Sequence, residues 1–308
     1  MKLKHLESAL SSLQRDFPNP NIQLEQYPCS PAIAAAVVLM AMEDGHVGPG
    51  RQVLDLGCGT GMLTAAAVYC EADHIWAVDC DETALAVARE NVQEVLEVLD
   101  DEEHDPVSFL LAKVKSVPTA ATATTDKKKQ GEQNHHHKGK HKGGRGARGS
   151  NNTRAAAAST QDMRDEILND GGHDGIPLPD NIVDTVLTNP PFGTKGNPGM
   201  DLRFLKTATR LASRAVYSFH KTSTRAFLQK HVETVWGLSF RVVAQMKFDI
   251  PQTYKFHKQS TVDVEVDLIR IDLHDDATEE ENIKTNTEQE DVDGELDERQ
   301  SSEQRAGR

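Results

Sequence analysis

The tetrapeptide Asn189-Pro190-Pro191-Phe192 brings two carbonyl groups and an aromatic ring together at one point of the chain. It follows the apolar run 182–187, which predicts a buried strand. The tetrapeptide is therefore expected at the carboxyl end of that strand, where open α/β sheets bind their ligands. Because neither proline can donate an N–H to a sheet ladder, the chain must leave the sheet here in a rigid conformation.

This motif suits chemistry at an amine. An exocyclic amine on a base or amide is a poor nucleophile, because its lone pair is delocalised. The carbonyl groups of Asn189 and Pro190 can each accept one amine hydrogen, which favours a tetrahedral nitrogen with its lone pair directed at an incoming methyl group. Phe192 would stack on the flat face of the acceptor, and Pro191 helps to hold the geometry. The alternative is an ordinary Asn-Pro turn that closes a strand.

A second group of residues that could do chemistry lies upstream, after the apolar run 52–56. This run predicts a short strand that enters the glycine-rich turn 57–61, and an alanine-rich helix is expected over residues 62–70. Glycines allow the backbone to pass close to a ligand at the end of a strand. The turn alone is weak evidence, because dinucleotide-binding folds use similar turns.

Two aspartates make the turn more specific. Asp55 opens it and could set the loop or approach the amino group of a methionine moiety. Asp79 closes the predicted strand 75–78 and is placed to hold two ribose hydroxyls. Because the downstream motif requires a methyl donor, these acids favour S-adenosylmethionine over NAD. The residues assigned to this cofactor are Asp55, Gly57, Gly59, Thr60, Gly61, Met62 and Asp79.

Longer segments of the chain resemble one family. Besides the glycine-rich turn, the shared segments are 24–28, 189–195, 215–221, 254–258 and 262–270. In these segments the chain is similar to the methyltransferase-like protein 5 family, which methylates adenine N6 in small-subunit (18S) ribosomal RNA. The similarity covers most of residues 1–112 and 160–272. It implies an α/β class I S-adenosylmethionine-dependent methyltransferase fold, Rossmann-like, with a seven-stranded, mostly parallel sheet and an antiparallel last strand.

The resemblance also implies cofactor contacts from Gln26 and Cys29, in a segment that the sequence alone predicts to be a simple loop. Cys29 stands where the family usually has threonine, which puts a hydroxyl-mediated contact in doubt. After the predicted strand 107–112 the family has an aspartate that meets the adenine of the cofactor, whereas this chain has Lys113 and then an insertion. Asp162 could supply that carboxylate from beyond the insertion.

A protein partner is implied by the same resemblance. The family works as a heterodimer with a small zinc-binding activator, the 112-type tRNA methyltransferase subunit, which extends the sheet edge. In this fold the predicted strand 107–112 would form an edge, and its residues Phe109, Leu110 and Leu111 would leave that edge apolar. The expected partners are therefore the activator and small-subunit ribosomal RNA.

Composition limits the number of domains and the kinds of metal or membrane site that the chain can contain. The chain has 308 residues, 37% of them hydrophobic, and a mean hydropathy of −0.54, which suits one α/β domain with segments left over. The four cysteines show no paired metal spacing, so we expect reduced thiols and no metal site. No signal peptide is evident and the apolar stretch 32–42 is too short to cross a bilayer. We expect no membrane partner and a location in the nucleus and cytoplasm.

Charge and complexity divide the chain into regions. We expect a methyltransferase domain over residues 1–272, interrupted by a disordered basic insert at about 115–160, and an acidic disordered tail at 273–308. The net charge is −14, yet residues 193–260 carry an excess of Lys and Arg. The insert could contact RNA or act as a nuclear address, and the alternative is a solvated loop.

Basic residues downstream of the motif are candidates for RNA contacts. The predicted helix 200–213 has a basic face of one sign, and the connection 254–258 combines aromatic and cationic residues, as in proteins that stack bases and hold phosphates. The alternatives are a solvated helix face and an ordinary loop. The candidate RNA contacts are Lys195, Arg203, Lys206, Arg210, Lys255 and Lys258.

Hydrophobic periodicity and capping signals place the remaining elements. Ser30 is the candidate N-cap of a helix that has Pro31 in its first turn. Helices are expected at 1–17, 32–42, 82–99 and 223–234, and strands at 214–219, 238–248 and 261–273.

These observations together predict methyl transfer from S-adenosylmethionine to N6 of an unpaired adenosine, with Asn189, Pro190, Pro191 and Phe192 as catalytic residues. A protein glutamine N5-methyltransferase is an alternative, because a side-chain amide suits the same motif. The basic second half of the chain, and Phe192 in place of the tyrosine common in that class, favour RNA. A non-catalytic RNA-binding scaffold is a further alternative, against which the intact acids and Asn189 argue.

Overall fold

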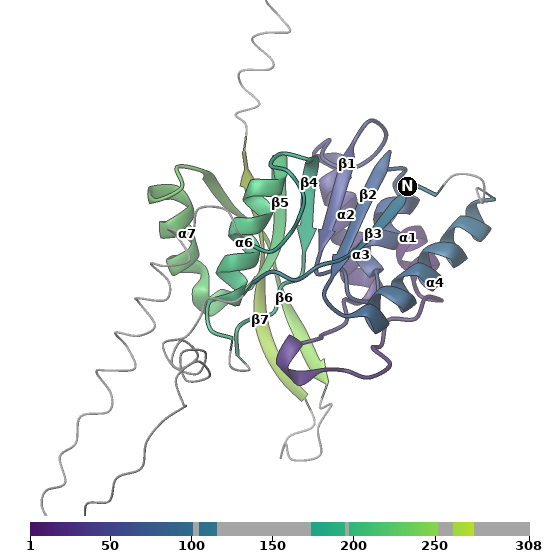
Figure 1. The fold of residues 1–308 in the computed structure, drawn as a ribbon, viewed down its shortest axis with the longest axis horizontal. Coiled ribbons are helices and arrows are strands. Elements are labelled where there is room, and N and C mark those ends of the chain that lie inside the picture. The colour runs from purple at the N-terminus through teal and green to yellow at the C-terminus, as the bar shows by residue number, and fades with distance from the viewer. Residues whose placement is uncertain (101–104, 116–173, 195–196, 252–260, 274–308) are drawn as a thin grey trace, which may run out of the picture.

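The strands form one twisted sheet (Figure 1). The computed structural model describes residues 1–100, 105–115, 174–194, 197–251 and 261–273. The seven-stranded sheet has the order β3-β2-β1-β4-β5-β7-β6. Its strands are β1 (Gln52–Leu56), β2 (His74–Asp79), β3 (Val107–Leu111), β4 (Val183–Thr188), β5 (Ala212–Lys221), β6 (Ser239–Pro251) and β7 (Thr261–Asp272). Strand β7 runs in the opposite direction to the other six strands, which confirms the predicted fold class.

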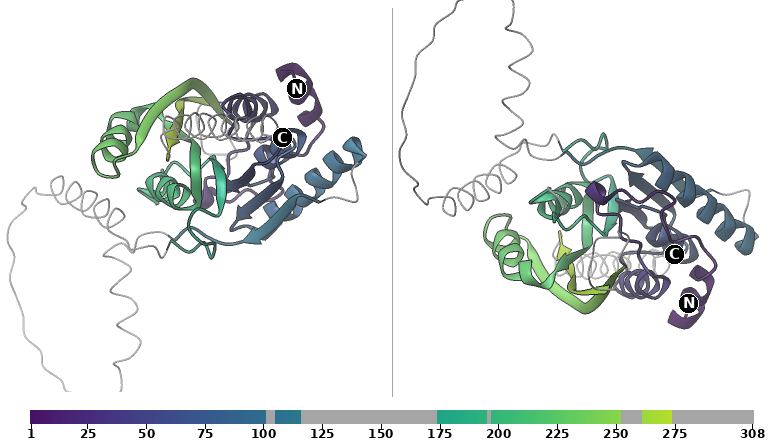
Figure 2. Two further views of the ribbon diagram at one scale, coloured as in Figure 1. Left: turned by 90° about the horizontal axis from the view of Figure 1, so that it is seen from above. Right: turned by 90° about the horizontal axis from the view of Figure 1, so that it is seen from below.

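Helices cover both faces of the sheet, as Figure 2 shows from above and below. One apolar core joins the sheet to α1 (Leu3–Leu10), α2 (Pro31–Glu43), α3 (Met62–Tyr69) and α4 (Glu82–Leu99). A second core, on the other face, joins it to α6 (Met200–Leu211) and α7 (Arg225–Thr234). Successive side chains of a strand point to opposite faces, so Val53 belongs to the first core and Leu54 to the second.

Capping residues explain where two of these helices begin. The Ser30 hydroxyl accepts a hydrogen bond from the Ile33 N–H at 3.3 Å and Pro31 opens α2, as predicted. The Asp81 carboxylate caps α4 by accepting from the Thr83 N–H at 2.9 Å. Two short 3₁₀ helices, η1 (Ile22–Leu24) and η3 (Thr222–Thr224), precede α2 and α7.

The first helix is shorter than the sequence predicts. The apolar spacing suggests a helix over residues 1–17, but α1 ends at Leu10. Leu13 is nevertheless buried, and the adjacent Gln14 exchanges backbone hydrogen bonds of 2.9 and 2.8 Å with the side chain of Asn91 in α4. This contact with another helix replaces the local hydrogen bonds that would continue α1. The prediction of residues 11–17 as helix was therefore wrong.

A second boundary shifts for a similar reason. The helix predicted over 200–213 ends at Leu211, because Ala212 already pairs with Val183 in the sheet. Strand β5 consequently begins before the predicted residue 214.

The chain leaves the described structure at Lys115 and enters it again at Asp174, and these two residues are neighbours. The Lys115 N–H donates to the Asp174 carbonyl at 2.8 Å. The predicted insert and tail lie outside the described residues, so the proposed division of the chain stays a prediction.

The two ends of the segment between Lys115 and Asp174 already meet, and shortening a long loop changes its closure entropy little. Deleting residues 118–158 is therefore expected to leave the melting temperature within about 2 °C of that of the full chain. Differential scanning fluorimetry with and without cofactor checks this. A large drop in melting temperature would show that the segment packs on the domain.

Candidate functional site

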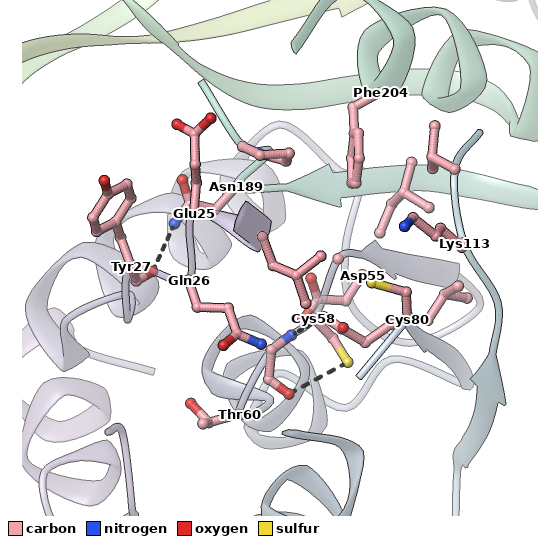
Figure 3. A pocket seen from close by; sticks show the side chains of 18 of the residues that line it. Glu25, Gln26, Tyr27, Asp55, Cys58, Thr60, Cys80, Lys113, Asn189 and Phe204 are labelled. Atoms are coloured by element: carbon pink, nitrogen blue, oxygen red, sulfur yellow. Dashed lines mark hydrogen bonds between the residues drawn. The ribbon is translucent and has the colours of Figure 1, made fainter. Parts of the chain in front are cut away.

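A pocket opens at the carboxyl ends of β1, β2 and β4 (Figure 3). Parallel strands present their carboxyl ends at the same edge of the sheet, so the glycine-rich turn after β1 and the motif after β4 meet there. The N-terminal segment 23–29 closes a further side of the pocket. The structure thus brings together two motifs more than a hundred residues apart in the sequence.

The glycine-rich turn is a tight cradle. The N–H groups of Gly57 and Cys58 both donate to the Val78 carbonyl, at 2.8 and 3.0 Å. Gly59 has φ 55°, and a Cβ there would lie 2.8 Å from the ring of Phe17. A larger residue at 59 would therefore require both a strained backbone and a shifted ring. Thr60 and Met62 also line the pocket, whereas the predicted cofactor residue Gly61 does not line it and is the N-cap of α3.

Asp79 connects this turn to the end of β2. Its two carboxylate oxygens accept from the Gly59 N–H at 2.8 Å and the Asp81 N–H at 2.9 Å. Burial raises the pKa of Asp79, and the backbone N–H donors oppose that rise. The side chain lines the pocket, as its predicted contact with ribose requires. That contact stays a prediction.

Asp55 is the second acid of the pocket, and it is only partly hydrogen-bonded. Its Oδ2 accepts from the Thr64 N–H at 3.0 Å and from the Thr64 hydroxyl at 2.7 Å. Within the described part of the chain its buried Oδ1 has no hydrogen-bond partner. Burial raises the pKa of Asp55 to about 7. A cationic group at Oδ1 would satisfy this oxygen and favour the ionised carboxylate.

The N-terminal segment adds polar groups to the opposite side. The Gln26 amide donates to Asp81 at 2.7 Å, and its carbonyl accepts from the Asn21 N–H at 2.7 Å. Asp81 was not among the predicted site residues, although its position before a helix is a capping signal. Cys29 is buried in the pocket wall, and burial raises the pKa of its thiol well above the usual range. Both predicted residues, Gln26 and Cys29, therefore line the pocket.

Asn189 lies where β4 ends, beside the cradle. The preceding Thr188 hydroxyl donates to the Leu56 carbonyl at 2.6 Å and so ties the ends of β4 and β1 together. The Asn189 amide donates to the Tyr27 carbonyl at 3.5 Å, which turns the side-chain carbonyl away from Tyr27. Pro191 also lines the pocket.

Phe192 lies beyond the pocket lining, in an aromatic group on the other side of the motif. Its ring centroid is 6.5 Å from that of Phe248, and the Lys221 ammonium is 5.7 Å from its centre. Pro190, between Asn189 and Phe192, is buried. Neither Pro190 nor Phe192 therefore lines the pocket, and the predicted stacking of the acceptor on Phe192 stays a prediction.

Two residues of the predicted basic face on α6 are not freely exposed to solvent. Arg203 is buried, with 6% of its surface exposed. Arg210 pairs with Asp174 at 2.8 Å and Asp180 at 2.9 Å, and it also donates to the Leu178 carbonyl. These side chains stabilise the domain and do not form an open surface for RNA. Lys206 is half-buried and its predicted role stays untested.

Other predicted contacts lie outside the described residues. These are Lys195, Lys255, Lys258 and Asp162. At the end of the pocket near β3 the lining is formed by Ala112, Lys113, Val114 and Ile176. Among the described residues, the carboxylates that line the pocket belong to Glu25, Asp55 and Asp79.

The described ranges also bear on metal binding and membrane insertion. There, no group of three or more His, Cys, Asp or Glu side chains is arranged to hold a metal ion. No helix in these ranges is long and apolar enough to cross a membrane.

The sheet order and the cradle at the ends of β1 and β2 define a class I S-adenosylmethionine-dependent methyltransferase fold. Residues 35–98 match the family model for ribosomal protein L11 methyltransferase (PrmA). This range contains the cradle and both pocket aspartates, but it ends well before Asn189.

Curated relatives match nearly the whole chain. The rRNA N(6)-adenosine-methyltransferase METTL5 of Danio rerio is 33% identical over 270 residues, which covers 88% of this chain and 98% of the relative. The Drosophila melanogaster Mettl5 protein is 33% identical over 274 residues, with 89% and 97% covered. The chain therefore belongs to the METTL5 family of rRNA N(6)-adenosine methyltransferases.

A solved structure shares the fold. A putative RNA methyltransferase from Pyrococcus horikoshii superposes with a TM-score of 0.56 at 24% identity, covering 88% of this chain and 96% of that one.

Proposed function

We propose that this protein transfers a methyl group from S-adenosylmethionine to N6 of an unpaired adenosine in small-subunit ribosomal RNA. The observation that carries this proposal is the meeting of Asn189 with the glycine cradle and its two aspartates in one pocket. Membership of the METTL5 family supports adenosine in ribosomal RNA as the acceptor, ahead of a protein glutamine. The small-subunit target rests on the family resemblance of the motifs.

The pocket residues fit the cofactor. The cradle allows close approach of a ligand to the backbone, Asp79 would hold the ribose hydroxyls, and the unsatisfied Oδ1 of Asp55 would face the cationic amino group. Gln26 and Cys29 would close the pocket over it. When bound, S-adenosylmethionine supplies an electrophilic methyl group attached to a sulfonium.

The chain itself prepares the acceptor amine. Hydrogen bonds from the amine to the carbonyls of Asn189 and Pro190 turn the nitrogen lone pair out of the plane of the base. No strong base is needed beforehand, because the nitrogen becomes acidic once it carries four substituents. The aromatic group of Phe192 and Phe248 provides a surface on which the base stacks, so an adenosine must leave its duplex to reach the site.

Asp55 makes cofactor binding depend on pH. Its folded-state pKa of about 7 lies above the usual carboxyl value, so this group stabilises the unliganded fold at low pH and loses that contribution as pH rises through 7. Cofactor binding should show the opposite trend, because a cationic ligand favours the carboxylate. We expect affinity to increase several-fold between about pH 6 and pH 8, with proton release.

Titration calorimetry in buffers of different ionisation enthalpy measures both the affinity and the released proton. The variant Asp55→Asn cannot ionise and should lose the pH dependence while retaining an oxygen for the Thr64 donors. An affinity that is equally pH-dependent in this variant would assign the titration to another group.

The proposed reaction is tested with labelled cofactor and ribosomal subunits that lack the modification, followed by nucleoside mass spectrometry. We expect N6-methyladenosine in small-subunit RNA. Label in another RNA would support adenosine methylation but contradict the small-subunit target. Methylglutamine in a ribosomal protein would support the glutamine alternative. Cofactor binding without transfer to any acceptor would support the non-catalytic scaffold.

We also propose that a small zinc-binding activator covers the β3 edge. In the described structure β3 pairs only with β2, so its other edge offers unpaired backbone groups. The apolar residue Leu111, at the end of β3, has an exposed fraction of 55%. An added strand would satisfy the edge and cover this apolar surface.

Replacing Leu111 by lysine should weaken co-purification of the activator at least about tenfold, because a charge would be buried in the interface. The matched control is Val235→Lys, since Val235 is 56% exposed at the end of α7, away from β3. Quantitative pull-down of the co-expressed subunits measures the effect. Equal recovery with both variants would place the partner on another surface.

A further inference from the structure

Residues 21–27, which we call the strap, connect the two halves of the site. The strap contains η1 and runs along the pocket between the cradle and the motif (Figure 3). Its neighbouring residues Glu25 and Gln26 point in opposite directions. The two side chains therefore contact different parts of the site.

Glu25 holds the chain that follows the catalytic motif. Its carboxylate oxygens accept from the Thr194 N–H at 2.6 Å and from the Thr194 hydroxyl at 2.7 Å. Thr194 is two residues beyond Phe192. A second contact comes from Asn197, whose amide donates to the Gln23 carbonyl at 2.8 Å. The strap thus holds the acceptor loop, residues 193–194 and 197, at two points, Glu25 and Gln23.

Gln26 makes the corresponding contact on the cofactor side. Its amide donates to Asp81 at 2.7 Å, and Asp81 in turn donates its own N–H to Asp79 at 2.9 Å. One short segment therefore contacts both the acceptor loop and, through Asp81, the pocket acid Asp79. When the strap forms one of these two contacts, it has less conformational freedom at the other.

Two features of Glu25 would each destabilise the fold if no other contact compensated for them. Only 5% of its surface is exposed, and its backbone has φ 50° and ψ 45°, in the left-handed region that residues other than glycine rarely adopt. Strain of this kind persists where surrounding contacts require it, and it is concentrated at functional sites. The paired hydrogen bonds to Thr194 are the contacts that this conformation makes possible.

We propose that Glu25 is a positioning residue for methyl transfer. Its carboxylate holds the acceptor loop against the strap that also closes the cofactor pocket, so that Asn189 and the pocket are ordered together. Glu25 acts through Thr194 and does not itself contact the amine. This inference rests on the proposed methyl transfer for its kinetic readout, but its structural readout is independent of any reaction.

The kinetic test compares substitutions at Glu25 under saturating cofactor and RNA. Glu25→Ala should lower kcat by about 100-fold, the effect expected of a misplaced reacting group, while cofactor affinity changes less than about fivefold because Gln26 remains. Glu25→Gln should restore activity to within about fivefold, since an amide can accept from the Thr194 N–H and donate to its hydroxyl. The matched control is Glu90→Ala, an exposed glutamate of α4, which should behave as wild type.

Hydrogen exchange of the Thr194 amide provides the readout that does not need activity. In the wild type this amide should be protected, and further protected when S-adenosylhomocysteine is added. In Glu25→Ala it should exchange at least about tenfold faster and no longer respond to the ligand. Because Thr194→Val removes only the hydroxyl donor, it tests the same contact from the loop if the alanine variant is unstable.

The possible outcomes separate the two proposals. A wild type that fails to methylate RNA contradicts the proposed function, yet faster Thr194 exchange in Glu25→Ala would still support the positioning role of Glu25. If the wild type is active and Glu25→Ala has unchanged kcat and unchanged Thr194 exchange, the positioning role of Glu25 is overturned and the proposed function is not. A fall in kcat that Glu25→Gln does not restore would also overturn it, because hydrogen bonding would then not explain the loss.

Discussion

Replacing Asn189 by alanine is expected to lower methyl transfer by at least about 1000-fold while leaving cofactor affinity within about threefold. Removing one preorganised hydrogen-bonding group at a reacting atom costs about 100-fold to 1000-fold, and the acceptor amine here also loses the group that turns its lone pair toward the methyl donor. The Asn189 amide contacts the strap only at 3.5 Å, so its loss should not open the cofactor pocket. Single-turnover assays with saturating enzyme isolate this step.

The matched variant is Asn189→Asp, which keeps carbonyl-type acceptors but loses the amide donor to Tyr27. It should retain more activity than the alanine variant, because the acceptor amine still finds an oxygen. Substantial single-turnover activity in Asn189→Ala would mean that the amine is oriented by other groups. A parallel loss of cofactor affinity would instead assign Asn189 to the structure of the pocket.

The second large effect is expected at Asp79. Its replacement by alanine removes the predicted ribose contacts and also leaves the N–H groups of Gly59 and Asp81 without their acceptor. Each charge-assisted hydrogen bond lost costs about 1.5–3 kcal/mol, so cofactor affinity should fall by two orders of magnitude or more. Calorimetric titration with S-adenosylhomocysteine measures the loss.

The control for Asp79 separates loop stability from ligand binding. Asp79→Asn keeps one oxygen that can accept from a backbone N–H, so the cradle should be less disturbed than in the alanine variant. Its cofactor affinity should still fall about tenfold or more, because the charge is absent. Wild-type affinity in both variants would contradict the assignment of Asp79 to the ribose.

Much of the fold follows from local sequence patterns. The apolar run 52–56 and the glycines after it predict β1 and the cradle, and the structure has that strand at Gln52–Leu56. The helix predicted over 82–99 is α4, with the same bounds. Here hydrophobic periodicity, capping and turn residues all favour the same element, and such agreement is what makes a local prediction succeed.

The same patterns also predict that the main parts of the site meet in one place. Asn189 and Asp79 each follow a predicted parallel strand, and the carboxyl ends of parallel strands meet at one edge of the sheet. The cofactor class also followed from residue types and spacing, because a motif for amine methylation requires a methyl donor. These inferences needed only the order of elements along the chain.

The sequence could not predict which polar side chains would become buried or paired. Arg203 and Arg210 have the helical spacing of an exposed basic face, yet one is buried and the other pairs with Asp174. The acid lies 36 residues from its partner. Periodicity describes which residues share a face of a helix, but the packing of the whole domain decides whether that face is exposed to solvent.

The strap shows the same limit at the site itself. The sequence alone predicts the segment 26–29 to be a simple loop, and nothing local connects Glu25 with Thr194, which is 169 residues away. Their contact exists because β4 is inserted beside β1, which carries the acceptor loop to the N-terminal segment. The sequence by itself therefore determined the cofactor cradle and the amine-directed motif, because each depends on local periodicity and turns, and its resemblance to a known family implied the fold class. The tertiary structure alone decided how these parts are joined, because hydrogen bonds between distant segments form only after the sheet has brought their partners together.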